Sequence, residues 1–258
     1  CVRKRGAAQN SETGEGMMRL DKVLADLGIG TRKELKQLIR SGRVNVNGET
    51  VSDPGMHVDP EQDELFLDGQ QLAYEKYVYF MLNKPQGIVS ATRDASETVL
   101  DLLDEPYKDL FPCGRLDKDT EGLLLITNDG PLAHQLLSPK HHIEKEYLVT
   151  IRHPLSDQDI RRIEDGMTLQ SGEVFQPAHV IPVSDTQIRL ILKEGKYHEI
   201  KRMLLALDNE VTALKRLRMK NLALDETLGP GEYRRLSEAE IQSLRAPEDF
   251  TSRTPVSQ

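Results

Sequence analysis

The chain has 258 residues, 34 of them basic and 42 acidic, and this length suits one full core with a small accessory module. No apolar run approaches the roughly 20 residues that cross a bilayer, and the start of the chain lacks the apolar segment of a signal peptide, so we expect a cytoplasmic protein with no membrane contact. The two cysteines, Cys1 and Cys113, cannot form a disulfide framework or a cysteine-based zinc site, and both thiols are expected to be free.

The net charge of −8 is unevenly distributed along the chain. Residues 18–48 carry seven cations and three anions, residues 49–77 carry eight acids and one lysine, and residues 193–220 carry eight cations and four acids. Two basic stretches on an acidic chain suit a polyanion that is bound at defined places. The alternative is that these charges form solvated helix faces that bind nothing.

The N-terminal segment is predicted to form two helices and a hairpin. Residues 20–27 carry apolar side chains at helical spacing. Residues 31–40 form a second helix, which begins with the capping-box pair Thr31 and Glu34 and is apolar on one face and cationic on another. Residues 43–51 alternate around an Asn-Gly pair, which is the strongest short signal for a β-hairpin.

This segment resembles the S4 RNA-binding domain over residues 18–70, on the stretches RLDK and GTRKELKQLIRSGRVNVNG. The resemblance implies that structured ribosomal RNA is a partner, because S4 domains read RNA shape and phosphates. The side chains expected to contact RNA in this module are Arg19, Lys22, Arg32, Lys33, Lys36, Arg40 and Arg43.

A larger domain is expected after a linker at residues 71–77. Its strands are predicted at residues 77–87, 122–127, 145–152 and 186–195, and its helices at 155–166 and 198–207. Strands outnumber helices, and hairpin-length loops join several of them. The pattern therefore favours an α+β fold with a mixed, mainly antiparallel sheet over a doubly wound parallel one.

An acidic stretch, GRLDKDTEGLLLITNDG at residues 114–130, precedes the apolar run of one predicted strand. Its acids match three positions of a calcium-binding EF-hand loop, but Asn128 stands where a bidentate glutamate is needed. A carboxylate pair of the glycosidase type is a weaker alternative. The simplest alternative is a polar turn in which Arg115 and Asp117 form an ion pair with each other. The spacing of the residues alone does not distinguish among these alternatives.

The same stretch resembles the active-site motif of pseudouridine synthases, G-R-L-D-x-x-T-x-G-L, whose aspartate corresponds to Asp117. Three further stretches match the family in the same order: LNKPQG at 82–87, EKEYLV at 144–149 and EGKYHEIKRM at 194–203. The chain is identified as a member of this family and is similar to its 16S ribosomal RNA branch. The resemblance implies a catalytic domain at residues 78–243. We also expect a disordered extension at 1–17, before the first predicted helix, and a disordered tail at 244–258.

The resemblance also implies roles for individual residues. Asp117 is expected to be the catalytic carboxylate, with Lys201 as its counter-charge, although spacing alone would make Lys201 a surface lysine. Tyr147 shares a strand face with apolar residues and is core by spacing, but the resemblance implies that it stacks on the uracil. Lys84 is interpreted as structural. Further RNA contacts are expected from Arg115, His198, Arg202 and Arg216, and from the neighbouring Lys215, Arg218 and Lys220.

The implied activity is the isomerisation of a uridine of 16S ribosomal RNA, uridine 516, to pseudouridine. The reaction involves neither redox chemistry nor group transfer, so we expect no cofactor and no metal, and we expect a monomer. Two alternatives stay open: a synthase of the same family that acts on 23S ribosomal RNA, and a non-catalytic RNA-binding protein of the S4 type.

Overall fold

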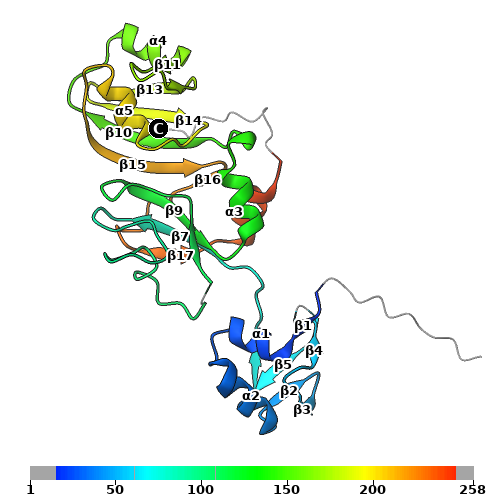
Figure 1. The fold of residues 1–258 in the computed structure, drawn as a ribbon. Coiled ribbons are helices and arrows are strands. Elements are labelled where there is room, and N and C mark those ends of the chain that lie inside the picture. Colours follow the sequence, from blue (N-terminus) through cyan, green and yellow to red (C-terminus); the bar gives the residue numbers. More distant parts are fainter. Residues whose placement is uncertain (1–15, 61, 108, 248–258) are drawn as a thin grey trace, which may run out of the picture. The chain divides into compact units, whose positions relative to one another are not determined.

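The computed structural model describes residues 16–60, 62–107 and 109–247 (Figure 1). Most of the two stretches predicted to be disordered, at 1–17 and 244–258, lies outside the described residues. The chain divides into two compact units, Cys1–Lys76 with Glu105–Asp109, and Tyr77–Asp104 with Leu110–Gln258.

The first unit consists of two helices and short antiparallel strands. The helices are α1 (Leu20–Asp26) and α2 (Arg32–Arg40); the strands are β1 (Met18–Arg19) paired with β4 (His57–Val58), and a sheet in the order β3 (Glu49–Val51), β2 (Val44–Val46), β5 (Leu65–Leu67) and β6 (Gln70–Leu72). Thr31 and Glu34 form the predicted capping box. The predicted hairpin joins β2 to β3, and its turn residues Asn47 and Gly48 have φ angles of 51° and 84°, as a two-residue hairpin turn requires.

The core of the first unit collects the apolar faces of both helices against the sheet. Leu24, Leu35, Ile39 and Val44 are fully buried there. The cations of α2 lie on its opposite, exposed face, as the helical spacing predicts.

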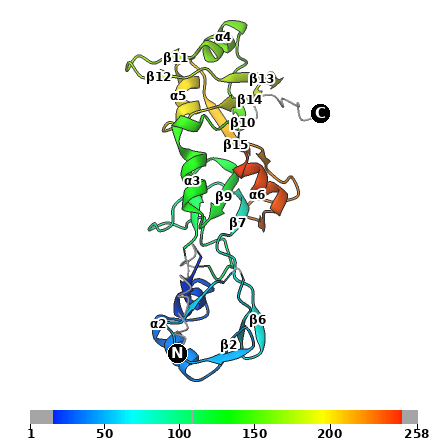
Figure 2. The ribbon, with the colours of Figure 1, turned by 90° about the vertical axis from the view of Figure 1, so that its right-hand side faces the viewer.

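The second unit is built on a nine-stranded sheet whose main path runs β13-β14-β10-β15-β9-β7-β17 (Figures 1 and 2). In that order the strands are His179–Ser184, Gln187–Leu192, Lys145–Ile151, Val211–Met219, Glu121–Thr127, Tyr79–Lys84 and Tyr233–Arg235. β8 (Phe111–Cys113) pairs with β9, β16 (Leu222–Ala223) pairs with β15, and β11 (Met167–Thr168) pairs with β12 (Val174–Phe175) outside the sheet. Only β15 and β9 run parallel among these described strands. The predicted α+β class with a mixed, mainly antiparallel sheet is confirmed.

Four helices and one short 3-10 turn accompany the strands in the described part of this unit. They are α3 (Gly130–Leu137), η1 (Pro139–His141), α4 (Asp157–Asp165), α5 (Glu199–Leu205) and α6 (Glu238–Arg245). Ser156 caps α4 and Gly166 ends it, which agrees with the helix predicted at residues 155–166. The sequence analysis missed α3 and α6, whose Leu136 and Leu244 pack into one core with β7 and β9.

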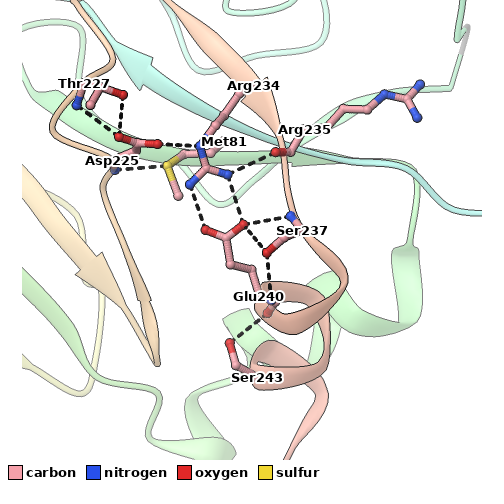
Figure 3. Close-up of polar contacts among 8 residues, drawn as sticks. All are labelled: Met81, Asp225, Thr227, Arg234, Arg235, Ser237, Glu240 and Ser243. Atoms are coloured by element: carbon pink, nitrogen blue, oxygen red, sulfur yellow. Dashed lines mark hydrogen bonds and ion pairs between the residues drawn. The ribbon is translucent and has the colours of Figure 1, made fainter.

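Arg234 of β17 anchors α6 and the loop that precedes β17 (Figure 3). Its guanidinium donates to Asp225 Oδ2 at 2.6 Å and to Glu240 Oε1 at 2.8 Å. Glu240 in turn completes the capping box of α6 with Ser237. The hydrogen bond from Arg234 lowers the pKa of Glu240 to about 2. Arg234 therefore holds the first turn of α6 through a carboxylate that is also part of the helix cap.

None of the helices in the described residues is both long enough and apolar enough to cross a membrane.

Candidate active site

Asp117 lies in the tight loop between β8 and β9. The backbone N–H of Thr120 donates to the Asp117 carbonyl at 3.0 Å and closes the turn. Gly122 follows in β9 with a φ of +100°, and a Cβ there would lie 2.3 Å from the backbone oxygen of Arg216. Only glycine allows β9 to approach β15 so closely, so the loop is held at the junction of the two parallel strands.

Lys84 supports this loop from inside the protein. Its side chain is fully buried, and its ammonium donates to the carbonyls of Thr120 at 3.0 Å and Pro85 at 2.9 Å. Burial lowers the pKa of Lys84 to about 8, although the charges of Asp119 and Asp117 oppose this shift. The position agrees with the structural role predicted for Lys84.

Lys201 of α5 forms ion pairs with two carboxylates of the loop. Its Nζ atom lies 3.0 Å from Oδ2 of Asp117 and 2.6 Å from Oδ1 of Asp119. Burial opposes the charge on Lys201, but hydrogen bonds to Asp119 and Asp117 outweigh burial and raise its pKa. The hydrogen bond from Lys201 also lowers the pKa of Asp119.

His198 approaches the other oxygen of Asp117. Its Nε2 atom lies 3.4 Å from Oδ1 of Asp117. The backbone of His198 is in the left-handed region with φ of 49°, an unusual conformation for a side chain other than glycine. Such residues cluster at functional sites, where the surrounding structure holds them.

A pocket of about 80 Å³ opens beside Asp117. Tyr147 of β10 forms part of its wall, lying in register with Leu190 of β14 and Arg216 of β15. The pocket is lined by Arg115, Leu116, Asp117, Thr120, Tyr147, Leu192, Gly195, Lys196, His198, Glu199, Ile200, Lys201 and Leu214. The structure therefore brings the three residues expected to be catalytic around one cavity.

A second, more open hollow adjoins the pocket. Both hollows share Asp117, His198 and Lys201, and the second is also lined by Gln86, Gly87, Lys118 and Asp119. Asp117 thus lies between the pocket and the second hollow.

Two polar groups of the pocket wall were missed by the sequence analysis. The hydroxyl of Thr120 is buried and has no hydrogen-bond partner among the described residues. Glu199 is only 4% exposed, and burial, together with a hydrogen bond to Glu194, raises its pKa to about 8. Burial therefore favours the protonated form of the Glu199 carboxyl group.

Several residues of the second basic stretch are not available for RNA, which corrects an expectation. Arg216 is 2% exposed and donates to the carbonyl of Leu123 at 2.7 Å, because it occupies an inward position of a central strand. Lys220 is also buried. Arg218 pairs with Glu146 at 2.9 Å.

The remaining predicted contact residues lie on or near the surface. Arg115 is exposed at the pocket, whereas the guanidinium of Arg202 is engaged by Glu173. In the first unit Arg19 pairs with Asp21, Arg43 pairs with Asp68, and all seven predicted cations are exposed: Arg19, Lys22, Arg32, Lys33, Lys36, Arg40 and Arg43.

The sequence also predicted free cysteine thiols and no metal site. Cys113 is a free, buried thiol, and burial raises its pKa to about 11, whereas Cys1 lies outside the described residues. Within the described ranges no cluster of three or more His, Cys, Asp or Glu side chains is arranged to hold a metal ion.

Comparison with known proteins gives consistent matches over most of the chain. Residues 78–206 match the family described as RNA pseudouridylate synthase, and residues 18–65 match the S4 domain. An uncharacterized RNA pseudouridine synthase of Bacillus subtilis is 47% identical over 238 residues, which cover 90% of this chain and 100% of that protein. The ribosomal small subunit pseudouridine synthase A of Escherichia coli K12 is 44% identical over 232 residues, which cover 88% and 100%. A crystal structure of a pseudouridylate synthase has a TM-score of 0.63 at 40% identity, covering 88% of this chain and 99% of that one.

Proposed function

Because the chain belongs to the RNA pseudouridylate synthase family, we propose that it converts uridine 516 of 16S ribosomal RNA to pseudouridine, with Asp117 as the catalytic carboxylate. The observation that carries the proposal is the ion pair of Asp117 with Lys201 at the mouth of the pocket. The choice of 16S RNA rests on the small-subunit synthases, which resemble this chain over nearly their whole length.

The reaction rearranges one nucleotide without gain or loss of atoms. The N1–C1′ bond breaks, the uracil turns while still enclosed, and C5 bonds to C1′. N1 gains a proton and C5 loses one, so no cofactor is needed. Asp117 can assist by attacking C1′, by attacking C6 or by accepting a proton from C2′.

The surroundings of Asp117 suit each of these roles. A carboxylate nucleophile or base must be ionised in a place from which water is excluded when the base enters. Lys201 supplies the opposing charge on one oxygen, and His198 lies beside the other. We propose that these two contacts hold the Asp117 carboxylate in position beside the sugar.

Tyr147 is proposed to bind the extruded uracil. Its side chain is 9% exposed and lines the pocket, so one part of the ring faces the cavity while the strand holds the rest. Aromatic rings stack on bases, and the hydroxyl of Tyr147 can help to remove the C5 proton. The hydroxyl of Thr120, which has no hydrogen-bond partner among the described residues, is proposed to bind a polar edge of the same base.

The S4 domain is proposed to hold RNA away from the reacting nucleotide. Extruding a base from stacked RNA costs a few kcal/mol, which contacts elsewhere must offset. The exposed cations of α2 provide such contacts with phosphates. We propose that the S4 domain begins at residue 18 and the catalytic domain at residue 78, and that the protein is a monomer that works in the cytoplasm.

The test of the proposed function is single-turnover pseudouridine formation on a 16S fragment that contains uridine 516. Asp117→Asn keeps the size of the side chain but removes its charge, so activity should fall below detection while RNA binding persists. Asp119→Asn is the matched control, because Asp119 also pairs with Lys201 but its side chain is 68% exposed. The control should keep at least a tenth of the wild-type rate, a loss of about 1.4 kcal/mol or less.

Mapping pseudouridine in the ribosomal RNA of a deletion strain decides the target. Loss of pseudouridine at position 516 of 16S RNA supports the proposal. Loss at a 23S site with 16S unchanged supports the alternative synthase, and an unchanged map together with RNA binding supports a non-catalytic binder.

A further inference from the structure

We propose that Tyr197 is a stacking platform for the base of a nucleotide next to the target uridine, an inference that rests on the proposed function. Tyr197 is 76% exposed, the largest exposed fraction of any large apolar side chain in the described residues. Its ring stacks on that of His198, with centroids 3.8 Å apart and planes 18° from parallel. His198 covers one face of the tyrosine ring, and most of the remaining surface is open to solvent.

The platform stands at the edge of the candidate active site. His198 lines both the pocket and the adjoining hollow, and its ring lies 3.4 Å from Asp117. A ring stacked on His198 therefore lies close to the reacting carboxylate. On this proposal, the RNA strand beside an extruded uridine passes over Tyr197.

The platform is held in place by contacts of its own backbone. Arg202 donates from its NH1 atom to the carbonyl of Tyr197 at 3.2 Å. The guanidinium of Arg202 is itself fixed by an ion pair with Glu173 and lies 5.3 Å from the centre of the Phe175 ring. A binding surface that is already ordered loses little conformational entropy when its ligand arrives.

Extrusion of a uridine creates the binding partner for such a ring. When the target leaves the stack, the bases on both sides lose a stacked neighbour, and an exposed aromatic side chain can replace it. Stacking of a base on an aromatic side chain contributes about 1–3 kcal/mol and does not depend on the identity of the base. The ligand is thus an unpaired nucleobase of any type, on the 5′ or the 3′ side of the target.

The experiment combines protein variants with RNA that lacks single bases. Tyr197→Ala should weaken binding of the 16S fragment about 5- to 150-fold. Tyr197→Phe should bind like the wild type, because stacking uses the ring and not the hydroxyl. Leu205→Ala is the matched control, because Leu205 lies on α5, is 69% exposed and does not line either hollow.

Abasic nucleotides placed one at a time beside the target identify the partner base. At one flanking position, removal of the base should weaken RNA binding by the wild type. The same removal should not weaken binding by Tyr197→Ala any further, because this variant has already lost the stacking contact. Two results would refute the stacking role of Tyr197. One is that the losses of affinity caused by Tyr197→Ala and by base removal add at every flanking position. The other is that Tyr197→Ala binds the RNA within about twofold of the wild type.

This outcome is separable from failure of the proposed function. If the wild type converts no uridine in the 16S fragment, the proposed target is wrong, and the same cycle is run on the RNA identified by the deletion-strain map. If the wild type converts uridine 516 and the losses add, the proposed function stands without the platform.

Discussion

The ammonium of Lys201 lies 3.0 Å from Oδ2 of Asp117, although 84 residues separate them in sequence. Neither partner is fully exposed, since their side chains retain 26% and 30% of their accessible surface. Charges in such a place interact more strongly than at an open surface, where ion pairs contribute little. A substitution of Lys201 therefore removes the ion pair while the side chain of Asp117 itself stays unchanged.

Lys201→Met is expected to lower the single-turnover rate about 10- to 100-fold, because Asp117 loses the ammonium that holds its Oδ2 atom at 3.0 Å. The rate is measured with saturating RNA. Lys196→Met is the control, because Lys196 lines the same pocket but pairs with Glu194, and its rate should match the wild type. A Lys201→Met rate within about threefold of the wild type would contradict a role of this ion pair in catalysis.

Glu199→Gln is expected to stabilise the protein more at pH 8 than at pH 5. The folded pKa of Glu199 is raised by burial to about 8 from 4.5, so its favourable contribution is present at low pH and is lost as pH rises through this window. Glutamine keeps the shape and has no proton to lose. Urea unfolding at pH 5, 6.5 and 8 measures the difference, which should grow with pH, and a constant difference would show that Glu199 is ionised in the folded protein at all three values.

Lys84→Met should lower the rate and the stability together, while RNA affinity stays close to that of the wild type. The change leaves the carbonyls of Thr120 and Pro85 without their buried donor, which costs about 1–3 kcal/mol for each group. Urea unfolding and single-turnover kinetics measure the two effects. A variant of normal stability and rate would show that water replaces the ammonium.

Arg234→Met is expected to destabilise the protein without a change in the rate of folded enzyme. The hydrogen bond from Arg234 holds the pKa of Glu240 at about 2, below its ordinary 4.5, so this contribution is present above pH 4.5 and is lost as pH falls toward 2 (Figure 3). The difference in unfolding free energy between variant and wild type should therefore shrink from pH 7 to pH 3. A difference that is equal at both values would assign the effect to packing.

Neutralising Arg32, Lys36 and Arg40 together as glutamines should weaken RNA binding and flatten its salt dependence. Each phosphate contact that is lost lowers the slope of log affinity against log salt by about 0.7–0.9. Binding is measured between 50 and 300 mM salt, and the single-turnover rate at saturating RNA should be unchanged. An unchanged slope would show that this face of α2 does not meet phosphates.

Local signals in the sequence predict a large share of the fold. The capping box at Thr31 and the Asn47-Gly48 turn are confirmed, because each depends on a few neighbouring residues. The same kind of signal was present for the two missed helices. Asp129 caps α3 with a proline in its first turn, and Ser237 opens a capping box.

Long-range pairing could not be predicted in the same way. β15 lies between β10 and β9, and no local pattern specifies that a strand will insert between two earlier ones. This placement buries Arg216 on the inward face beside Leu214, against the usual preference of arginine for solvent. The raised pKa of Glu199 could not be predicted either, since it depends on burial that only the folded chain defines.

The family predicted from four motifs is confirmed, whereas the roles of individual residues stay predictions. Motif resemblance identified Asp117, Tyr147 and Lys201, and the structure brings them around one pocket. Motif resemblance did not identify Tyr197, because an exposed aromatic residue suggests a binding role only when its neighbours in the fold are known.

The parallel ladder of β15 and β9 is short, with Lys215 opposite Glu121 and Arg216 opposite Gly122, and it joins two antiparallel groups of strands. Asp117 precedes a strand of one group, whereas Tyr147 lies on a strand of the other. Pairing between distant strands closes late because loop entropy opposes it. A refolding chain therefore acquires most of its hairpins before it acquires a catalytic centre, and recovery of enzymatic activity reports the docking of two half-sheets rather than the formation of secondary structure.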